Sequence, residues 1–266
     1  MKYKVIRRFN LWKNRSDEEL EVETVLVSGL EKFEVLEWLA DNYYRVYLDD
    51  ALLSIKEIET GSISYYAFYT WGLLELYGTT FRISYLKEAC RMAEELLERF
   101  FDSRRGGFYP YAADGEQLIT RIKEVYDGAL PSGNAVAALV LSRLGRLTGE
   151  EKWRQATQLQ LRYLTGAIRT YPAGHSFTLL TLLEKLWPTA ELICAAQAVP
   201  EELKDYLRRQ PRQGLTVLVK TPENADALAE LAPFTANYPV PEAGTRYDLC
   251  SGGTCRQPVS SIEKLE

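Results

Sequence analysis

The chain has 266 residues, 46% of them hydrophobic and 26% charged, which suits one large folded domain or a domain with a small appendage. Its formal charge of −5 argues against the basic face that nucleic-acid-binding proteins need. No apolar run is long enough to span a membrane, and Met1 is followed by Lys2 and Lys4 without an apolar signal core. We therefore expect a cytoplasmic protein with neither nucleic acid nor membrane as a partner.

The first 30 residues are interpreted as an irregular or partly extended lead-in. Two β-branched runs, 4–9 and 22–29, are separated by a charged stretch of helix-capping type at 14–19. A helix is expected from Leu30 to about Val46, with Phe33 and Leu36 on its apolar side.

Paired helices follow. Ser64–Tyr77 is apolar or aromatic nearly all round, with Glu75 its only charge, so it is predicted to be a deeply buried inner helix. Ser84–Phe101 is amphipathic and is predicted to be a more exposed outer helix. The same apolar–amphipathic pattern recurs at 135–147 and 150–167, which indicates repeated helical hairpins. A third pair is expected to begin at 176–187, where Pro188 ends its first helix.

From Glu191 the pattern changes to short strand-type runs. Two runs are predicted to be strands, 191–196 and 215–220, and a final strand is predicted at 234–240, with helices at 200–209 and 222–231 between them. This β-α-β-α-β order favours a small parallel sheet. The first strand is not followed by G-x-G-x-x-G, so a dinucleotide site is not expected, and no other cofactor is expected. The domains are therefore predicted as a lead-in (1–30), an α/α-hairpin domain (31–190) and an α/β tail (191–266).

The loop before the helix predicted at 135–147 carries the residues best suited to a functional site. Asp127, Ser132 and Asn134 precede or begin a helix, where a carboxylate and free backbone amides can face a ligand. Glu124 and Asp127 together could perform general acid–base chemistry, with Arg121 and Lys123 adjusting their charge states. The alternative is structural, with Asp127 capping a tight turn that aims the helix and Glu124 solvated.

The histidine and cysteines offer little metal chemistry. His175 is the one histidine of the chain, and it is either part of a site or a loop or cap residue. Cys250 and Cys255 have C-x4-C spacing without a second pair, so a zinc site is not expected. A reversible disulfide and a simple structural turn both remain open. Cys90 and Cys194 fall in apolar stretches and are predicted to be core residues.

Several ungapped motifs occur in an order that resembles a known family. These are YYAFYTWGLLELYGTTF at 65–81, EQLITRIKEVYDGALPSGNAVAAL at 116–139, YPAGHS at 171–176 and YDLCSGGTCRQPV at 247–259. Over about residues 40–260 the chain resembles the C-terminal half of the spermatogenesis-associated, thioredoxin-domain-containing family.

The resemblance implies an (α/α)6 toroid like that of six-hairpin glycosidases and N-acylglucosamine 2-epimerases, following a thioredoxin-like domain. The thioredoxin-like domain and the early hairpins have no counterpart in this chain. Ser64 and Tyr65 replace the family's acidic pair. We therefore expect no epimerase or glycosidase activity from the chain alone.

The sequence thus predicts a mainly α fold, a partial (α/α) toroid of about three hairpins with a small C-terminal α/β tail. Two functions compete: a non-catalytic binding or scaffold module that binds a carbohydrate, and a sugar-processing enzyme acting at a central cleft. The expected partners are a small-molecule sugar and either a missing half-toroid or a second copy. The candidate residues are Asp127 and Glu124 for catalysis and Tyr66, Tyr126, Ser132, Asn134 and His175 for ligand binding; no metal ligand is predicted.

Overall fold

A computed structural model of the chain describes residues 9–12, 19–22, 62–112, 122–210, 214–252 and 254–265. The chain divides into two compact units, Met1–Gly61 and Ser62–Glu266. In the first unit, β1 (Phe9–Trp12) pairs antiparallel with β2 (Glu19–Val22), so the extended character expected of the lead-in is present. The helix expected from Leu30 to about Val46 lies outside the described residues.

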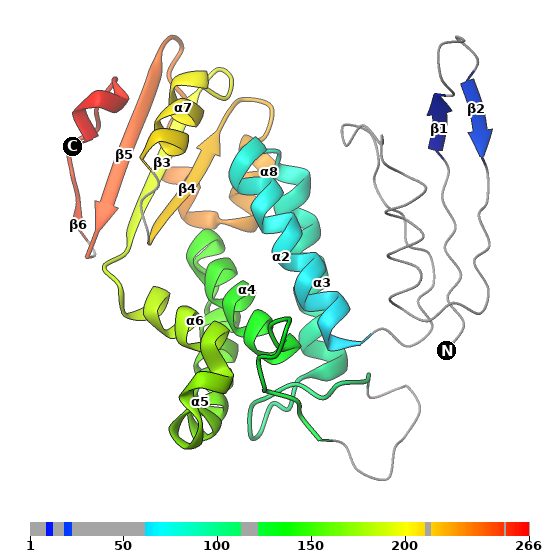
Figure 1. Cartoon of the computed structure of the whole chain (residues 1–266). Coiled ribbons are helices and arrows are strands. Elements are labelled where there is room, and N and C mark those ends of the chain that lie inside the picture. Colours follow the sequence, from blue (N-terminus) through cyan, green and yellow to red (C-terminus); the bar gives the residue numbers. More distant parts are fainter. Residues whose placement is uncertain are drawn as a thin grey trace. The chain divides into compact units, whose positions relative to one another are not determined.

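The second unit begins with helices that follow the predicted periodicity closely. Their bounds are α2 (Ile63–Thr80), α3 (Ile83–Phe100), α4 (Gly133–Thr148), α5 (Glu151–Thr170) and α6 (Ser176–Leu186). In Figure 1, α4, α5 and α6 form the green part of the unit, and α2 and α3 run alongside one another. Within the described residues, no helix is long and apolar enough to cross a membrane.

The expected difference in burial between α2 and α3 is wrong. Each helix buries seven of its 18 residues, because several aromatic side chains of α2, such as Tyr65 and Tyr69, are only partly covered. The buried helix is instead α4, in which 14 of 16 residues are buried. Its alanines at 135, 137 and 138 are completely covered, since small side chains let neighbouring helices approach closely on several sides. The inner-and-outer layering of a toroid is therefore not visible in the α2/α3 pair.

The prediction of a third helical hairpin is also wrong. Helix α6 is followed directly by β3 (Ala190–Ala196), so no outer helix pairs with it in sequence. Pro188 explains the change, because proline cannot continue a helix and favours extended backbone in the residue before it. Trp187 is accordingly extended.

The tail forms a mixed four-stranded sheet rather than a parallel one. Its strands are β3, β4 (Leu215–Lys220), β5 (Thr245–Ser251) and β6 (Thr254–Cys255), in the order β4-β3-β5-β6. β3 pairs parallel with β4 and antiparallel with β5. The short helices α7 (Glu201–Arg209) and α8 (Ala225–Leu231) lie between the strands in sequence.

The last strand was predicted at the wrong place. Pro233–Asn237 forms the 3-10 helix η2, and the final long strand begins only at Thr245. The turn is stabilised locally, because the Thr235 hydroxyl donates to the Ala232 carbonyl at 2.7 Å and buried Lys220 donates to the Thr235 carbonyl at 2.7 Å. These contacts are specified by tertiary packing and leave no periodic signal.

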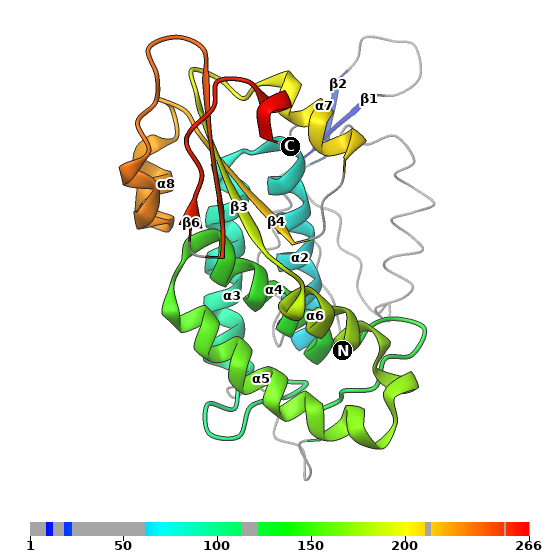
Figure 2. The ribbon, with the colours of Figure 1, turned by 90° about the vertical axis from the view of Figure 1, so that its left-hand side faces the viewer.

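The helices and the tail share one hydrophobic core. A single cluster of buried side chains joins Tyr77 of α2 and Leu144 of α4 to Ile193 of β3 and Leu218 of β4. Figures 1 and 2 both show the sheet at one end of α2 and α4. The fold is therefore mainly α with a small α/β tail packed on its end.

Candidate functional site

Asp127 joins the N-termini of two helices. Its Oδ1 accepts a hydrogen bond from the Ser132 backbone N–H at 2.8 Å, beside the start of α4. Its Oδ2 accepts from the N–H groups of Phe177 and Thr178, at 2.9 and 3.3 Å, in the first turn of α6. Free N–H groups and the helix dipole both favour a carboxylate at such positions. Since both oxygens already have backbone donors, the geometry matches the turn-capping alternative for Asp127.

The carbonyl of Val125 also connects this loop to the segment before α6. It accepts from the Ser132 hydroxyl at 3.3 Å and contacts Nδ1 of buried His175 at 2.8 Å. Because a carbonyl only accepts, His175 carries its proton on Nδ1 here. His175 ends the 3-10 helix η1 (Pro172–His175), whose Gly174 carbonyl accepts from the Asp127 N–H at 2.8 Å. The loop before α4 and the segment before α6 are thus bonded together.

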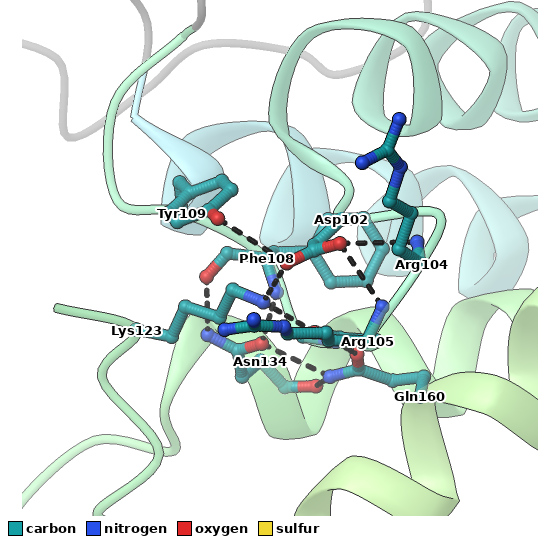
Figure 3. A network of polar contacts seen from close by, with 10 residues as sticks. Asp102, Arg104, Arg105, Phe108, Tyr109, Lys123, Asn134 and Gln160 are labelled. Carbon is teal, nitrogen blue, oxygen red and sulfur yellow. Dashed lines mark hydrogen bonds and ion pairs between the residues drawn. The ribbon is translucent and has the colours of Figure 1, made fainter. Parts of the chain in front are cut away.

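Asn134 and Gln160 form a buried amide network, shown in Figure 3. Asn134 Oδ1 accepts from the Phe108 N–H at 2.7 Å, and its Nδ2 donates to the carbonyls of Phe108 and Glu124 at 3.0 and 2.7 Å. Gln160 Nε2 donates to Asn134 Oδ1 at 3.0 Å, and its Oε1 accepts from the Gly107 N–H at 2.7 Å. Both amides are fully engaged with protein groups, which fixes the 101–112 loop against α4 and α5.

Lys123 is anchored away from Glu124 and Asp127. Its ammonium donates to Asp102 at 2.8 Å and to the Gly106 carbonyl, and it lies 4.7 Å from the ring centroid of Tyr109 (Figure 3). The hydrogen bond from Lys123 holds the pKa of Asp102 well below its usual range. Gly106 and Gly107 have φ values of 74° and 80°, a left-handed conformation that lets the loop turn there. Lys123 therefore stabilises the loop and is not placed to tune an acid–base pair.

The predicted site residues fall into buried and exposed groups. Ser132, Asn134 and His175 are buried in the networks described above. Tyr66 is buried as well, and its hydroxyl accepts from Arg99 at 2.6 Å. Glu124 is exposed, which agrees with the alternative that its side chain is solvated.

Tyr126 forms part of an exposed aromatic surface. It and Tyr171 are each 55% exposed. Both rings lie against Gly174, where an added Cβ would come within 2.8 Å of either ring. A side chain at position 174 would therefore force the two tyrosine rings to shift.

Helix α6 has an unusual distribution of side chains. Its fully buried residues are Thr178 and Thr181, both 0% exposed, whereas Leu180 is 55% and Leu186 81% exposed. We call the outward surface the α6 leucine face; it consists of Leu179, Leu180, Leu183, Leu186 and Trp187. These positions recur at helical spacing, so they form one stripe. In Figure 2, α6 lies in front of α4, on the side of the unit away from α3.

Sequence reasoning missed the α6 leucine face and left the cysteine pair undecided. The run LLTLLEKLW places leucines on both sides of a helix, so periodicity alone could not show which side is covered. Cys250 and Cys255 form a disulfide across β5 and β6, which is one of the two alternatives that the sequence left open. In the described part of the chain, no group of three or more His, Cys, Asp or Glu side chains is placed to hold a metal ion.

Comparison with known proteins supports the motif-based resemblance. The chain is 30% identical over 149 residues to spermatogenesis-associated protein 20 of Mus musculus, and 36% and 34% identical over 115 residues to the proteins of that name from Rattus norvegicus and Homo sapiens. The resemblance to the family is confirmed. The aligned segments cover 56%, 43% and 43% of this chain but only 19%, 15% and 15% of those relatives.

A more distant similarity covers more of the chain. An uncharacterised protein of Caenorhabditis elegans is 24% identical over 205 residues, which cover 76% of this chain and 27% of that protein. No protein-family model matches the chain. Because the chain spans less than a fifth of the spermatogenesis-associated relatives, their whole activity does not transfer to it.

Proposed function

We propose that this chain is a non-catalytic interaction module that pairs with a second copy of itself through the α6 leucine face. The observation that carries the proposal is the inverted packing of α6, with threonines buried and leucines exposed. Exposing leucine to water is unfavourable, and a contiguous apolar stripe of this kind marks an interaction surface. The occupied oxygens of Asp127 favour the non-catalytic reading over the sugar-processing one.

The chemistry of the stripe favours a second copy as its occupant. None of its five residues is charged, so two identical faces meet without repulsion in a two-fold interface. The neighbouring Glu184 is already paired with Arg143 and Arg146, each at 3.0 Å. An acidic or basic partner would find no complementary charge on the face. Two α6 helices packed antiparallel would also oppose their dipoles.

The size of the stripe is sufficient for a weak symmetric dimer. Its five side chains expose on the order of 500 Å², which is the size of the largest apolar patches on soluble monomers. A symmetric pair would therefore bury about 1,000 Å², the lower limit for a specific interface. We accordingly expect association that depends on protein concentration.

Leu183→Glu tests this interface, because it places a charge in the middle of the stripe. Light scattering coupled to size-exclusion chromatography, over a concentration series, should give the mass of a pair for the wild type at high concentration. The variant should dissociate at least about tenfold more readily, since burying an unpaired carboxylate is costly.

Leu130→Glu is the matched control, because Leu130 is 63% exposed on the loop before α4 and outside the stripe. It should pair like the wild type. A wild type that stays monomeric throughout, or a Leu183→Glu variant that pairs as strongly as Leu130→Glu, would refute the proposal.

Carbohydrate binding is the second candidate function, and the exposed rings of Tyr126 and Tyr171 favour it. Flat aromatic faces that keep a free hydroxyl are suited to stacking on pyranose rings. In a titration with N-acyl sugars followed by tyrosine and tryptophan fluorescence, we expect weak saturable binding that Tyr171→Ala abolishes. Tyr85→Ala, a change of a partly exposed tyrosine on α3, should bind normally. Equal binding by both variants would contradict this candidate.

A further inference from the structure

The disulfide lies at an accessible end of the sheet. Cys250 of β5 and Cys255 of β6 face each other in register, and Ser251, Thr254 and Cys255 are exposed. Cys250 is only partly covered. The other two cysteines, Cys90 and Cys194, are buried, and burial raises the pKa of each thiol to about 12. Thiolates are the reacting species in thiol chemistry, so exchange in the described residues is confined to the Cys250–Cys255 pair.

The two sulfur atoms of the pair have different surroundings. Cys255 belongs to a two-residue edge strand and is open to solvent. Sγ of Cys250 lies 3.8 Å from the hydroxyl of Tyr238. A disulfide sulfur has no proton, so Tyr238 is the only possible donor of this pair. An attacking thiolate can therefore reach Cys255, and the sulfur that departs is the one with a hydrogen-bond donor beside it.

We propose that Cys250–Cys255 is a thiol–disulfide exchange site, reduced by a dithiol. A thiolate of the reductant attacks Sγ of Cys255, the Cys250–Cys255 bond breaks, and Cys250 leaves as a thiolate that accepts a hydrogen bond from Tyr238. The second thiol of the reductant then attacks the mixed disulfide and releases Cys255. Two electrons and two protons pass from the dithiol, which becomes a disulfide, to the cysteine pair.

One neighbour opposes this step. Glu191 of β3 is directly opposite Cys250 in the register of the sheet, and its carboxylate disfavours a thiolate there. Tyr238 and Glu191 should therefore act in opposite directions on the departure of Cys250. Both are positioning residues, because neither exchanges a bond.

Opening the disulfide should leave the sheet intact. Beyond Cys255 the chain is held by the Arg256 N–H, which donates to the Leu249 carbonyl at 2.9 Å, and by two hydrogen bonds between Tyr247 and Val259 of 2.8 and 3.0 Å. Ile262 and Leu265 are buried in the core cluster. Reduction is thus expected to change only the end of the β5–β6 hairpin.

The regiochemistry is tested with reduced glutathione as the attacking thiol. The native, oxidised chain is mixed with glutathione, and freed thiols are blocked at once with iodoacetamide. Trypsin cleavage after Arg246 and Arg256 releases one peptide containing both cysteines, in which mass spectrometry locates each group. We expect glutathione on Cys255 and the alkyl group on Cys250. The opposite arrangement, or no reaction until the protein is unfolded, would overturn the proposal.

The positioning roles are tested by the rate of reduction by dithiothreitol. Tyr238→Phe should slow reduction of the native protein about three- to tenfold, because a donor to the departing thiolate is lost. Glu191→Gln should accelerate it by a similar factor. Both variants should match the wild type in denaturant, where a merely structural effect vanishes. Unchanged native rates, or rate differences that persist in denaturant, would refute these roles.

Discussion

Asp127→Ala should lower the free energy of unfolding by about 3–5 kcal/mol. The substitution leaves three backbone N–H groups, of Ser132, Phe177 and Thr178, without their carboxylate partner. Each is a charge-assisted hydrogen bond, and Asp127 itself is buried. The loss falls on the N-termini of two helices at once. Urea denaturation followed by far-UV circular dichroism measures the change.

Glu124→Ala is the control for Asp127, three residues earlier in the same loop. Its side chain is exposed, so the expected change is within about 0.5 kcal/mol. Should both variants prove equally stable, Asp127 would not be the structural residue that we describe. Its carboxylate would then be available for the acid–base role that the sequence suggested.

Asn134→Leu should also destabilise the protein by about 3–5 kcal/mol, because it replaces a buried amide by an apolar group with the same number and branching of heavy atoms. The N–H and C=O of Phe108 and the carbonyl of Glu124 would lose their side-chain partner. The Gln160 amide would lose one of its two acceptors on residue 134 and keep the backbone carbonyl. A buried network with one member missing is worse than an apolar core, since the remaining groups stay desolvated. The same urea titration applies.

Substitutions of two glutamines on α5 show whether the loss of stability comes from the buried network. Gln160→Leu should cost about 2–3 kcal/mol, because buried Gln160 bonds both Gly107 and Asn134. Gln158→Leu, two residues away on the exposed side, should change stability by less than about 0.5 kcal/mol. Similar losses at 158 and 160 would mean that the cost comes from the helix and not from the network.

The sequence predicted the helices of the second unit well because their apolar positions repeat at 3.6-residue spacing. Each of α2 to α6 begins within two residues of its predicted start. Burial was harder to predict. The aromatic α2 and the helix predicted at 135–147 were both interpreted as apolar helices of the inner type, but only alanine-rich α4 is buried nearly all round. Small side chains allow close packing from several sides, whereas the larger rings of α2 stay partly exposed.

The candidate site shows a similar limit. The glycine, proline, aspartate and asparagine residues between Tyr126 and Asn134 predicted a turn and a helix start, and α4 begins there at Gly133. The role of this loop depends on Phe177, Thr178 and Gln160, which are distant in sequence. Hydrogen bonds between residues that are 26 to 51 positions apart leave no local sequence pattern. The loop sequence is therefore equally consistent with a ligand-binding site and with a purely structural contact.

The shared core of helices and sheet also limits how this protein can be divided. Tyr77 and Leu144 lie in the same cluster as Ile193 and Leu218, so neither layer covers its own apolar surface. The two should unfold together as one cooperative block. The change in composition near Ala190 resembles a domain boundary in the sequence. Dividing the chain there should nevertheless leave neither part able to fold by itself.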